Sequence, residues 1–208
     1  MIDLRHVDCM EYLATCEDNA FELAIVDPPY GIGMDGRKGT KPKKACHNWQ
    51  PREFKNWDKA IPSKKYFKEV QRVSLHAIIW GGNYFSHLLP ASRCWLFWDK
   101  GQDLSMPDGE LAWTNMDRPI RRKTINRAST RVDGIVHPTQ KPVKLYEWLL
   151  MNYAKEGDRI LDTHLGSGSI AIACHNLGFD LVGCELDEHY YKGACERLER
   201  HKAQLRMF

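Results

Sequence analysis

The apolar run 23–26 ends abruptly at Asp27-Pro28-Pro29-Tyr30. A short, continuous apolar run is typical of a buried strand. Proline cannot donate to a sheet ladder and restrains the preceding residue to extended geometry, so we expect Asp27 at the carboxyl end of that strand. A rigid acid beside an unpaired backbone carbonyl and an aromatic ring indicates a functional site.

Similar apolar runs alternate with segments of helical periodicity along the rest of the chain. We expect further strands at 2–7, 76–80, 94–98, 110–114, 158–162 and 181–185, and helices at 10–13, 63–73, 84–89, 143–150, 170–177 and 190–204. Such alternation predicts an α/β fold with a mostly parallel sheet and helices on both faces. With 208 residues, 43% of them hydrophobic, the chain is expected to form a single domain, 1–208.

Composition argues against several classes of protein. The seven cysteines are an odd number and include no C-x-x-C pair, which disfavours a disulfide framework and a zinc knuckle. No apolar run approaches the roughly 20 residues of a membrane span, and residues 1–5 resemble a folded strand instead of a signal peptide. We therefore expect a cytoplasmic protein. The net charge of +3 does not by itself indicate a nucleic-acid partner.

A glycine turn, Gly166-Ser167-Gly168, lies between an expected strand and helix, and the next strand ends at Glu185. Such a turn lets a ligand approach the backbone, and an acid at this spacing can hold two ribose hydroxyls. The turn is one glycine short of a dinucleotide fingerprint, so an adenosyl ligand without pyrophosphate fits better than a nicotinamide. The alternative is an ordinary strand-to-helix turn followed by a surface acid.

The Asp27–Tyr30 tetrad, the glycine turn and the His137-Pro138-Thr139-Gln140-Lys141-Pro142 element together resemble the S-adenosylmethionine-dependent DNA amino-methyltransferases of the N6-adenine/N4-cytosine type. The tetrad comes first in the chain, which resembles the beta-type motif order, a circular permutation. The resemblance covers most of the chain. It implies a seven-stranded Rossmann-like methyltransferase sheet in which the strands beginning near residues 2, 181, 158, 23 and 76 are neighbours in that order.

The resemblance makes the tetrad catalytic and assigns a role to most of its members. The Asp27 carboxylate and the Pro28 carbonyl would accept the N–H groups of an exocyclic amine and aim its lone pair at a sulfonium methyl group. Tyr30 would stack on a base flipped from the duplex. The methyl donor is already activated, so no metal is expected. The alternative for Asp27 is a structural carboxylate at a strand end.

The resemblance also implies a cofactor site. Asp8 and Cys9 match the position that holds the adenine ring, Glu185 the ribose-binding acid, and the glycine turn the loop around the methionine moiety. Asp8 could instead cap the following helix, and Lys141, expected to pair with the methionine carboxylate, could simply point into water. The full set expected to bind cofactor is Asp8, Cys9, Asp27, Lys141, Asp162, His164, Gly166, Ser167, Gly168 and Glu185.

One residue departs from the family pattern. Asp162-Thr163-His164 stands where the family commonly has Asp-Pro-Phe. A histidine ring can pack where phenylalanine packs, but it titrates near neutral pH when unperturbed, so we expect cofactor affinity to depend on pH. A role as general base is the alternative.

Positive charge is concentrated in two segments, a glycine-containing loop insertion over 31–58 and a target-recognition segment over 101–136 that is most basic from 117 to 131. Basic runs often form solvated surfaces, but these two flank the expected catalytic strand, which favours contact with DNA phosphates and bases. The residues expected to contact DNA are Arg37, Lys38, Lys41, Lys43, Lys44, Arg118, Arg121, Arg122, Lys123 and Arg127.

The sequence therefore predicts a site-specific enzyme that methylates the N6 of a flipped adenine in double-stranded DNA, because an aspartate in the first tetrad position favours adenine in the family that it resembles. The alternatives are N4-cytosine methylation, methylation of RNA or of a protein amide, and a catalytically inactive nucleic-acid-binding relative. The resemblance also implies a homodimer and a cognate restriction endonuclease as partners.

Overall fold

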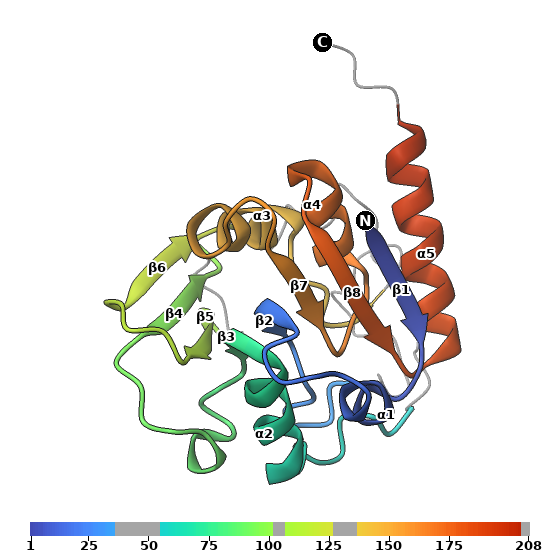
Figure 1. Ribbon diagram of the computed structural model, residues 1–208. Helices are drawn as coiled ribbons and strands as arrows, with labels where there is room; N and C mark the ends of the chain where they lie inside the picture. The colour runs from blue at the N-terminus through green and yellow to red at the C-terminus, as the bar shows by residue number, and fades with distance from the viewer. Residues whose placement is uncertain (36–54, 102–106, 127–136, 205–208) are drawn as a thin grey trace, which may run out of the picture.

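The computed structural model of the protein describes residues 1–35, 55–101, 107–126 and 137–204. These residues form one eight-stranded sheet in the order β1-β8-β7-β2-β3-β5-β4-β6 (Figure 1). Its strands are β1 (Ile2–His6), β2 (Phe21–Val26), β3 (Ser74–Trp80), β4 (Trp95–Asp99), β5 (Gly109–Thr114), β6 (Arg121–Thr124), β7 (Arg159–Asp162) and β8 (Asp180–Glu185).

The sheet is mostly parallel, which confirms the expected fold class. β5 is antiparallel to its neighbours β3 and β4, and all other pairs are parallel. The order β1-β8-β7-β2-β3 is the one that the family resemblance implied. The permuted motif order therefore still places the two halves of the expected site on adjacent strands, β2 and β7.

The sheet has one strand more than the seven expected. β6 lies at the edge and pairs in parallel with β4, from Leu96 opposite Arg121 to Asp99 opposite Thr124. Its sequence, Arg-Arg-Lys-Thr, has no apolar alternation by which it could be recognised as a strand. Charged side chains on such an edge strand hinder pairing with other chains.

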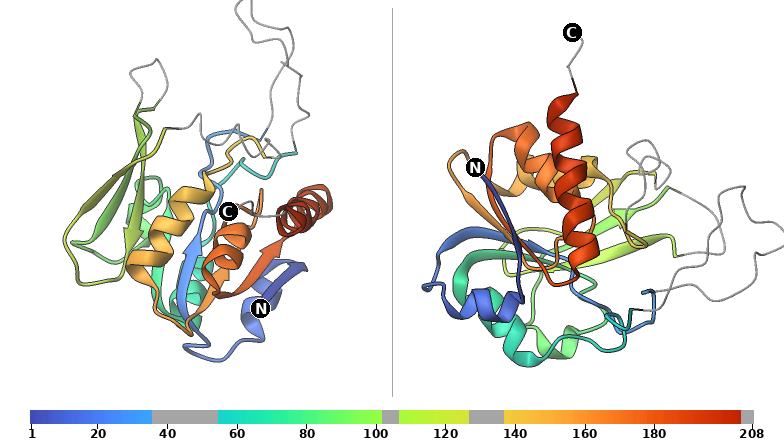
Figure 2. Two further views of the ribbon diagram at one scale, coloured as in Figure 1. Left: turned by 90° about the horizontal axis from the view of Figure 1, so that it is seen from above. Right: turned by 90° about the vertical axis from the view of Figure 1, so that its right-hand side faces the viewer.

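Helices cover both faces of the sheet, as Figures 1 and 2 show. α3 (Val143–Tyr153), α4 (Ser169–Leu177) and α5 (Glu188–Ala203) lie on one face, and α1 (Cys9–Ala14) and α2 (Lys64–Val73) lie on the other. Along β2, Leu23 and Ile25 pack into the core under the first group, while Ala24 and Val26 pack into the core over the second. Because both faces of β2 are buried, its sequence is continuously apolar.

The helix ends largely follow the sequence signals. The Ser63 side chain accepts a hydrogen bond from the Tyr66 backbone N–H and caps α2, and Gly178 ends α4 with a φ of 78°. The helix expected at 84–89 is instead a short 3-10 helix, η1 (Ser86–Leu88). A turn in which Tyr84 N–H bonds to Gly81 O precedes it and Pro90 follows it, which leaves too few residues for an α-helix. In the part of the chain that is described, no helix is long and apolar enough to cross a membrane.

Two glycines allow a matched test of the helix assignments. Gly178 has a left-handed backbone conformation, and Gly193 lies inside α5; a Cβ at either position would meet no atom within 4 Å. We expect Gly178→Ala to lower the free energy of unfolding by about 1 kcal/mol. The added methyl group would meet no atom, but alanine is strained in the left-handed backbone conformation. Gly193→Ala should raise it by about 0.5–1 kcal/mol, because alanine favours helix. Urea denaturation of both variants measures the two changes in the free energy of unfolding. Changes of the same sign would contradict these assignments.

Candidate active site

Four acids lie at the carboxyl ends of four neighbouring parallel strands. Asp8 follows β1, Glu185 ends β8, Asp162 ends β7 and Asp27 follows β2. The carboxyl edge of such a sheet is where ligands bind in open α/β folds. The four acids therefore gather at one edge of the sheet.

Asp27 is held by two side-chain donors. Its Oδ1 accepts a hydrogen bond from the Tyr30 hydroxyl at 2.6 Å, and its Oδ2 lies 2.5 Å from the Lys141 Nζ. Burial raises the pKa of Asp27, and the Lys141 ammonium opposes that rise. The Tyr30 phenol keeps its proton, because burial keeps its pKa well above the usual value. The carboxylate is therefore fixed in orientation, and each oxygen still has capacity to accept another bond.

Lys141 is buried, which excludes the alternative that its side chain simply points into water. Its side chain is 2% exposed, and its ammonium contacts Asp27 and, at 3.0 Å, Glu110 Oε2. Glu110, at the start of β5, also pairs with Lys100 at 2.9 Å. The Lys141 side chain thus contacts Asp27 and Tyr30 of the tetrad and does not point into water. Sequence reasoning missed Glu110, because its environment depends on where β5 lies beside β3.

The Tyr30 ring fills a space that only glycine leaves open. A Cβ on Gly81 would lie 2.1 Å from Tyr30 Cε1, and Gly81 has a φ of 72°. On another side the ring stacks on Tyr84, with the centroids 4.9 Å apart and the planes 17° apart. Tyr84 is 41% exposed, and Tyr30 is less exposed. Sequence reasoning did not select Tyr84, although it is an aromatic residue next to a glycine pair.

The backbone after the tetrad is held by Asp58, another residue that sequence reasoning missed. Its Oδ1 accepts from the backbone N–H groups of Tyr30 and Gly31, at 2.8 and 2.7 Å, and its Oδ2 accepts from Met34 at 2.7 Å. Asp58 is 2% exposed. The acid at the end of the 31–58 insertion thus binds the residues at its beginning. Residues 36–54 of that insertion lie outside the described part of the chain.

The glycine turn is tied to the acid expected to bind ribose. Glu185 Oε2 accepts from the Gly166 N–H at 2.8 Å, and its Oε1 accepts from the Asp187 N–H at 2.9 Å. Gly166 and Gly168 both have positive φ values, 52° and 70°, and a Cβ on Gly168 would lie 3.0 Å from the Ala194 Cβ. The glycines are therefore required by backbone conformation, and at Gly168 also by close packing. The buried Ser167 between them accepts a hydrogen bond from Arg197 through its carbonyl oxygen.

Asp8 and Cys9 lie where β1 leads into α1. Asp8 Oδ1 accepts from the Met10 N–H at 2.7 Å, so the residue does cap the helix, which was the alternative to adenine binding. Capping occupies one carboxylate oxygen, so it is compatible with a contact to a ligand through the other. Cys9 is the first residue of α1, and burial raises the pKa of its thiol to about 12, so it is not a reactive thiolate.

Asp162 is buried and His164 is partly buried, and both side chains are electrically neutral near pH 7. Burial raises the pKa of Asp162 to about 8 and lowers the pKa of His164 to about 4. The His164 ring meets the Tyr66 ring edge to face, with the centroids 5.4 Å apart. The predicted titration of His164 near neutral pH is therefore wrong, because burial disfavours the imidazolium. This environment agrees with the packing role.

The polar groups at this edge suit S-adenosylmethionine. The acids Asp8 and Glu185 are acceptors for the amino and hydroxyl donors of an adenosine, and burial raises the pKa of Glu185, so a donor there is favourable. The φ of Gly166 keeps a side chain from the loop that the methionine moiety would approach. The ring of His137 lies nearest to that glycine, 3.7 Å from where a Cβ would be. The residues present therefore fit the cofactor that the sequence predicts.

Of the arginines and lysines expected to contact DNA, some lie away from the edge where the acids gather. Arg121 begins β6 opposite Leu96, toward the amino ends of the parallel strands and away from Asp27. Arg118 donates to the Asn152 backbone carbonyl at 2.8 Å. The Arg122 side chain is 70% exposed and lies near Asp99, and Lys123 is closer to the carboxyl edge. Arg37, Lys38, Lys41, Lys43, Lys44 and Arg127 lie outside the described residues.

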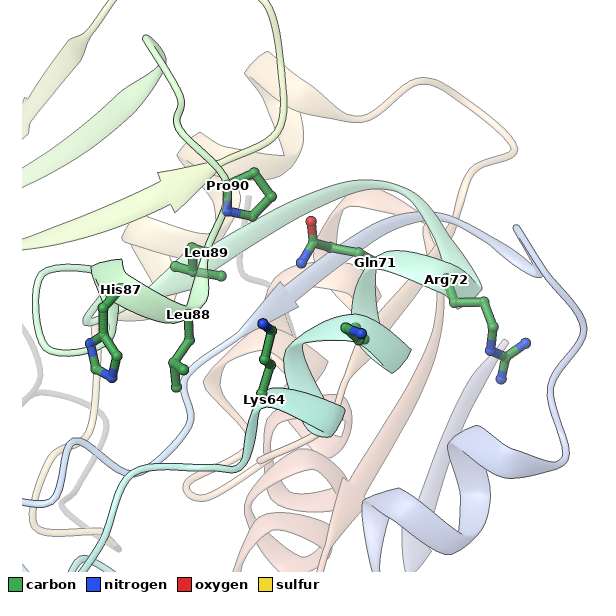
Figure 3. A pocket seen from close by; sticks show the side chains of 8 residues that line it. Lys64, Gln71, Arg72, His87, Leu88, Leu89 and Pro90 are labelled. Atoms are coloured by element: carbon green, nitrogen blue, oxygen red, sulfur yellow. The ribbon is translucent and has the colours of Figure 1, made fainter.

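A separate hollow of about 500 Å³ lies between α2 and the 87–90 segment. In Figure 3 the Lys64 and Gln71 side chains point between these two elements, whereas Arg72 points away. No tetrad or glycine-turn residue lines it. The hollow is therefore distinct from the carboxyl edge where the acids gather.

The buried Asp162 predicts a pH dependence of stability. The pKa of Asp162 is about 8 in the folded state and lower in the unfolded state, so the folded state binds the proton more tightly. The free energy of unfolding is therefore highest at low pH and falls as pH rises through about 8. From pH 5 to 8 this loss is at most about 4 kcal/mol, at about 1.4 kcal/mol per unit. Asp162→Asn should lose less stability than wild type over this range. Urea denaturation without cofactor measures it, with Asp117→Asn, an exposed acid, as control; equal pH slopes would refute the assignment.

Comparison with known proteins agrees with this geometry. The N6_N4_Mtase family model, described as DNA methylase, matches residues 79–196. The type II methyltransferase M.HpaI of Haemophilus parainfluenzae is 26% identical over 238 residues, which cover 92% of this chain and 72% of M.HpaI.

Solved structures share the fold. TTHA0409 from Thermus thermophilus, complexed with S-adenosyl-L-methionine, has a TM-score of 0.62 at 17% identity over 99% of this chain and 98% of its own. The cytosine-N4-specific PvuII DNA methyltransferase has a TM-score of 0.62 at 13% identity, over 97% and 90%. The family model covers more than half of the chain, which therefore belongs to the N6/N4 DNA methylase family and is an S-adenosylmethionine-dependent DNA amino-methyltransferase.

Proposed function

We propose that this enzyme methylates the exocyclic N6 of an adenine that has been flipped out of double-stranded DNA. The observation that carries the proposal is the position of Asp27. Its carboxylate lies at the carboxyl end of β2, directly beside β7 and the glycine turn that follows it, and both its oxygens are oriented by side-chain donors. An acceptor fixed in this way suits an amino group that must be held before transfer.

The chemistry requires that the amine be made nucleophilic. The lone pair of an exocyclic nitrogen is delocalised into the base, and acceptance of its two N–H bonds by the Asp27 carboxylate and the Pro28 carbonyl would localise it. Bound S-adenosylmethionine supplies a methyl group that is already activated by the sulfonium. Methyl transfer would form a bond between the nitrogen and the methyl carbon and break the bond from that carbon to sulfur, whose electron pair stays on the sulfur. The nitrogen must also release one proton, and the Asp27 carboxylate is the acceptor held beside it.

We assign the base-stacking role to the aromatic pair of Tyr30 and Tyr84. Aromatic side chains bind unstacked bases by offset stacking, in a sequence-tolerant way. Tyr84 is the more exposed ring of the stacked pair. A base that enters from solvent would therefore meet Tyr84 first and reach Tyr30 as its amine reaches Asp27.

Adenine is preferred over cytosine because the first tetrad residue is aspartate. Fold likeness does not decide the matter, since the cytosine-N4-specific PvuII enzyme has the same TM-score as TTHA0409. Mapping of methylated bases in the genomic DNA of an expressing host distinguishes N6-methyladenine from N4-methylcytosine. Absence of N6-methyladenine would sink the proposal.

Removal of the acceptor tests its role. We expect Asp27→Ala to reduce methyl transfer at least about a thousandfold while cofactor affinity changes by no more than a few fold, because Asp27 acts on the amine. Transfer of tritiated methyl to unmethylated genomic DNA and calorimetric titration with cofactor measure the two quantities. Asp117→Ala, at an exposed acid, is the matched control. Unchanged turnover in Asp27→Ala would show that the carboxylate has another role.

Glu185 should act in the opposite way. Glu185→Gln replaces a carboxylate by an amide that can accept through only one oxygen, so we expect cofactor affinity to fall at least about tenfold. The rate of transfer at saturating cofactor should change far less than in Asp27→Ala. Calorimetric titration measures the affinity, and wild-type affinity in the variant would contradict the ribose-binding assignment.

Four further expectations concern partners and location. Double-stranded DNA is the substrate implied by the family. We infer that a second copy of the chain helps in target recognition, because two of the four described arginine and lysine candidates lie away from the site edge. Sedimentation of the enzyme with and without DNA tests for this dimer. The cognate restriction endonuclease and the cytoplasmic location stay predictions.

A further inference from the structure

Four charged side chains of alternating sign form a chain that begins at the catalytic carboxylate. Asp27 contacts Lys141, Lys141 contacts Glu110 at 3.0 Å, and Glu110 contacts Lys100 at 2.9 Å. They come from four separate parts of the fold: the end of β2, the 137–142 turn, the start of β5 and the residue after β4. The Lys100 and Lys141 side chains are 8% and 2% exposed, and those of Asp27 and Glu110 are 17% and 23% exposed. This network is therefore largely shielded from water.

Such burial makes every member depend on its neighbours. A buried ion without a partner costs several kcal/mol, whereas two acids and two bases in contact give a cluster without net charge. Burial lowers the pKa of Lys141, but the Asp27 and Glu110 carboxylates outweigh it and raise the pKa above the usual value. Burial likewise raises the pKa of Glu110, but the ammonium groups of Lys141 and Lys100 outweigh it and hold the value at about 2. Lys141 and Glu110 are thus both ionised at neutral pH.

Lys141 and Glu110 act on Asp27 in opposite directions. Burial of Asp27 favours its protonated form, which could not accept the amine N–H as a carboxylate does. The adjacent Lys141 ammonium favours ionisation. Glu110 repels the Asp27 carboxylate and shares the Lys141 ammonium with it, so the pull of Lys141 on Asp27 is weaker than it would be in an isolated pair. An isolated pair would hold Asp27 ionised but would weaken it as an acceptor.

We propose that Lys141, Glu110 and Lys100 are positioning residues that tune the catalytic carboxylate: Lys141 keeps Asp27 ionised, Glu110 shares that ammonium so that Asp27 stays a strong acceptor, and Lys100 balances the charge of Glu110. The inference rests on the proposed role of Asp27 in methyl transfer. It explains why Lys141 is buried against the tetrad. It also explains why Glu110, which contacts Lys141 and not the Asp27 carboxylate, is largely buried beside it.

Other groups also face Asp27. They are Tyr30 in the tetrad, Tyr66 on α2, Tyr146 on α3 and Asp162 on β7. Burial holds the pKa values of the three phenols well above the usual range, so they are neutral near pH 7. Asp162 is largely protonated there. Lys141 and Glu110 are accordingly the ionised side chains that dominate the field at Asp27 near neutral pH.

The test is the pH dependence of the single-turnover rate of methyl transfer, measured with tritiated cofactor and excess enzyme on unmethylated genomic DNA. Lys141→Met should shift the acid limb of the profile upward by about one pH unit or more, because Asp27 loses its cation. Glu110→Gln should shift it downward and lower the plateau rate severalfold, because Lys141 then pairs with Asp27 alone. The shifts belong to the coupled cluster, so the comparison is of apparent midpoints.

The double variant guards against simple damage to the fold. Lys141→Met with Glu110→Gln removes one charge of each sign, so its midpoint should lie between those of the single variants. A purely structural defect would instead reduce the rate more in the double variant than in either single variant, and the midpoint would not return toward the wild-type value. Lys192→Met and Glu188→Gln, an exposed ion pair on α5, are matched controls that should shift nothing. Calorimetric titration with cofactor should give affinities within a few fold of wild type in every variant.

Two outcomes separate the two levels of the argument. Wild-type enzyme that transfers no methyl group to DNA at any pH would refute the proposed function. Active wild-type enzyme whose Lys141→Met and Glu110→Gln variants shift in the same direction, or do not shift, would overturn the tuning role alone. If a single variant fails to fold, the double variant is compared with the single variant that folds. A midpoint below that of Lys141→Met, or above that of Glu110→Gln, supports the proposal, and a midpoint equal to or beyond that of the single variant opposes it.

Discussion

The parallel pairing of β2 with β7 is the contact on which the site depends. Leu23 lies opposite Ile160, although the two residues come from distant parts of the chain. The pairing places the residues that follow both strands at one edge, because parallel strands share their carboxyl ends. The tetrad and the glycine turn each have local chemistry of their own, but neither brings an amine and a methyl donor together. Their juxtaposition comes from the sheet.

The 137–142 element adds a second link between the same two halves. His137 lies over Gly166 and meets the Tyr190 ring at 4.4 Å between centroids, while Lys141 contacts Asp27. One short turn thus touches the glycine turn at one end and the tetrad at the other. Movement of the turn would change both sides, so its two prolines have a plain physical purpose: they reduce the number of conformations available to it.

The sequence was sufficient for the parts of the fold that local rules determine. The apolar run of β2, the positive-φ glycines and the acids at strand ends each have a direct signal, and the family resemblance added the strand order. β6 gave no signal, because an exposed edge strand of arginine and lysine lacks alternation. Glu110, Asp58 and Tyr84 were missed for another reason. Each lies at the site through a partner distant in sequence, and no property of the residue or its neighbours indicates that partner.

His164 illustrates the same limit in electrostatics. Its residue type indicated a group that titrates near neutral pH, yet burial lowers its pKa to about 4. The side-chain type gives the unperturbed value, and the surroundings decide how far the value moves. Lys141 differs in the opposite sense, since a lysine that would ordinarily be solvated is held as a cation inside the protein by two carboxylates.

The hydrogen bonds of Asp58 have a consequence for how this enzyme can diversify. One carboxylate at the far end of the 31–58 insertion binds the backbone of Tyr30, Gly31 and Met34 at its near end. Both ends of the insertion are therefore fixed to each other, independently of the length or composition of what joins them. Loop-closure entropy grows only slowly with length, so such a segment can be exchanged at small cost to stability. The sequence between the two ends can therefore change over evolution while the backbone that follows the tetrad stays fixed.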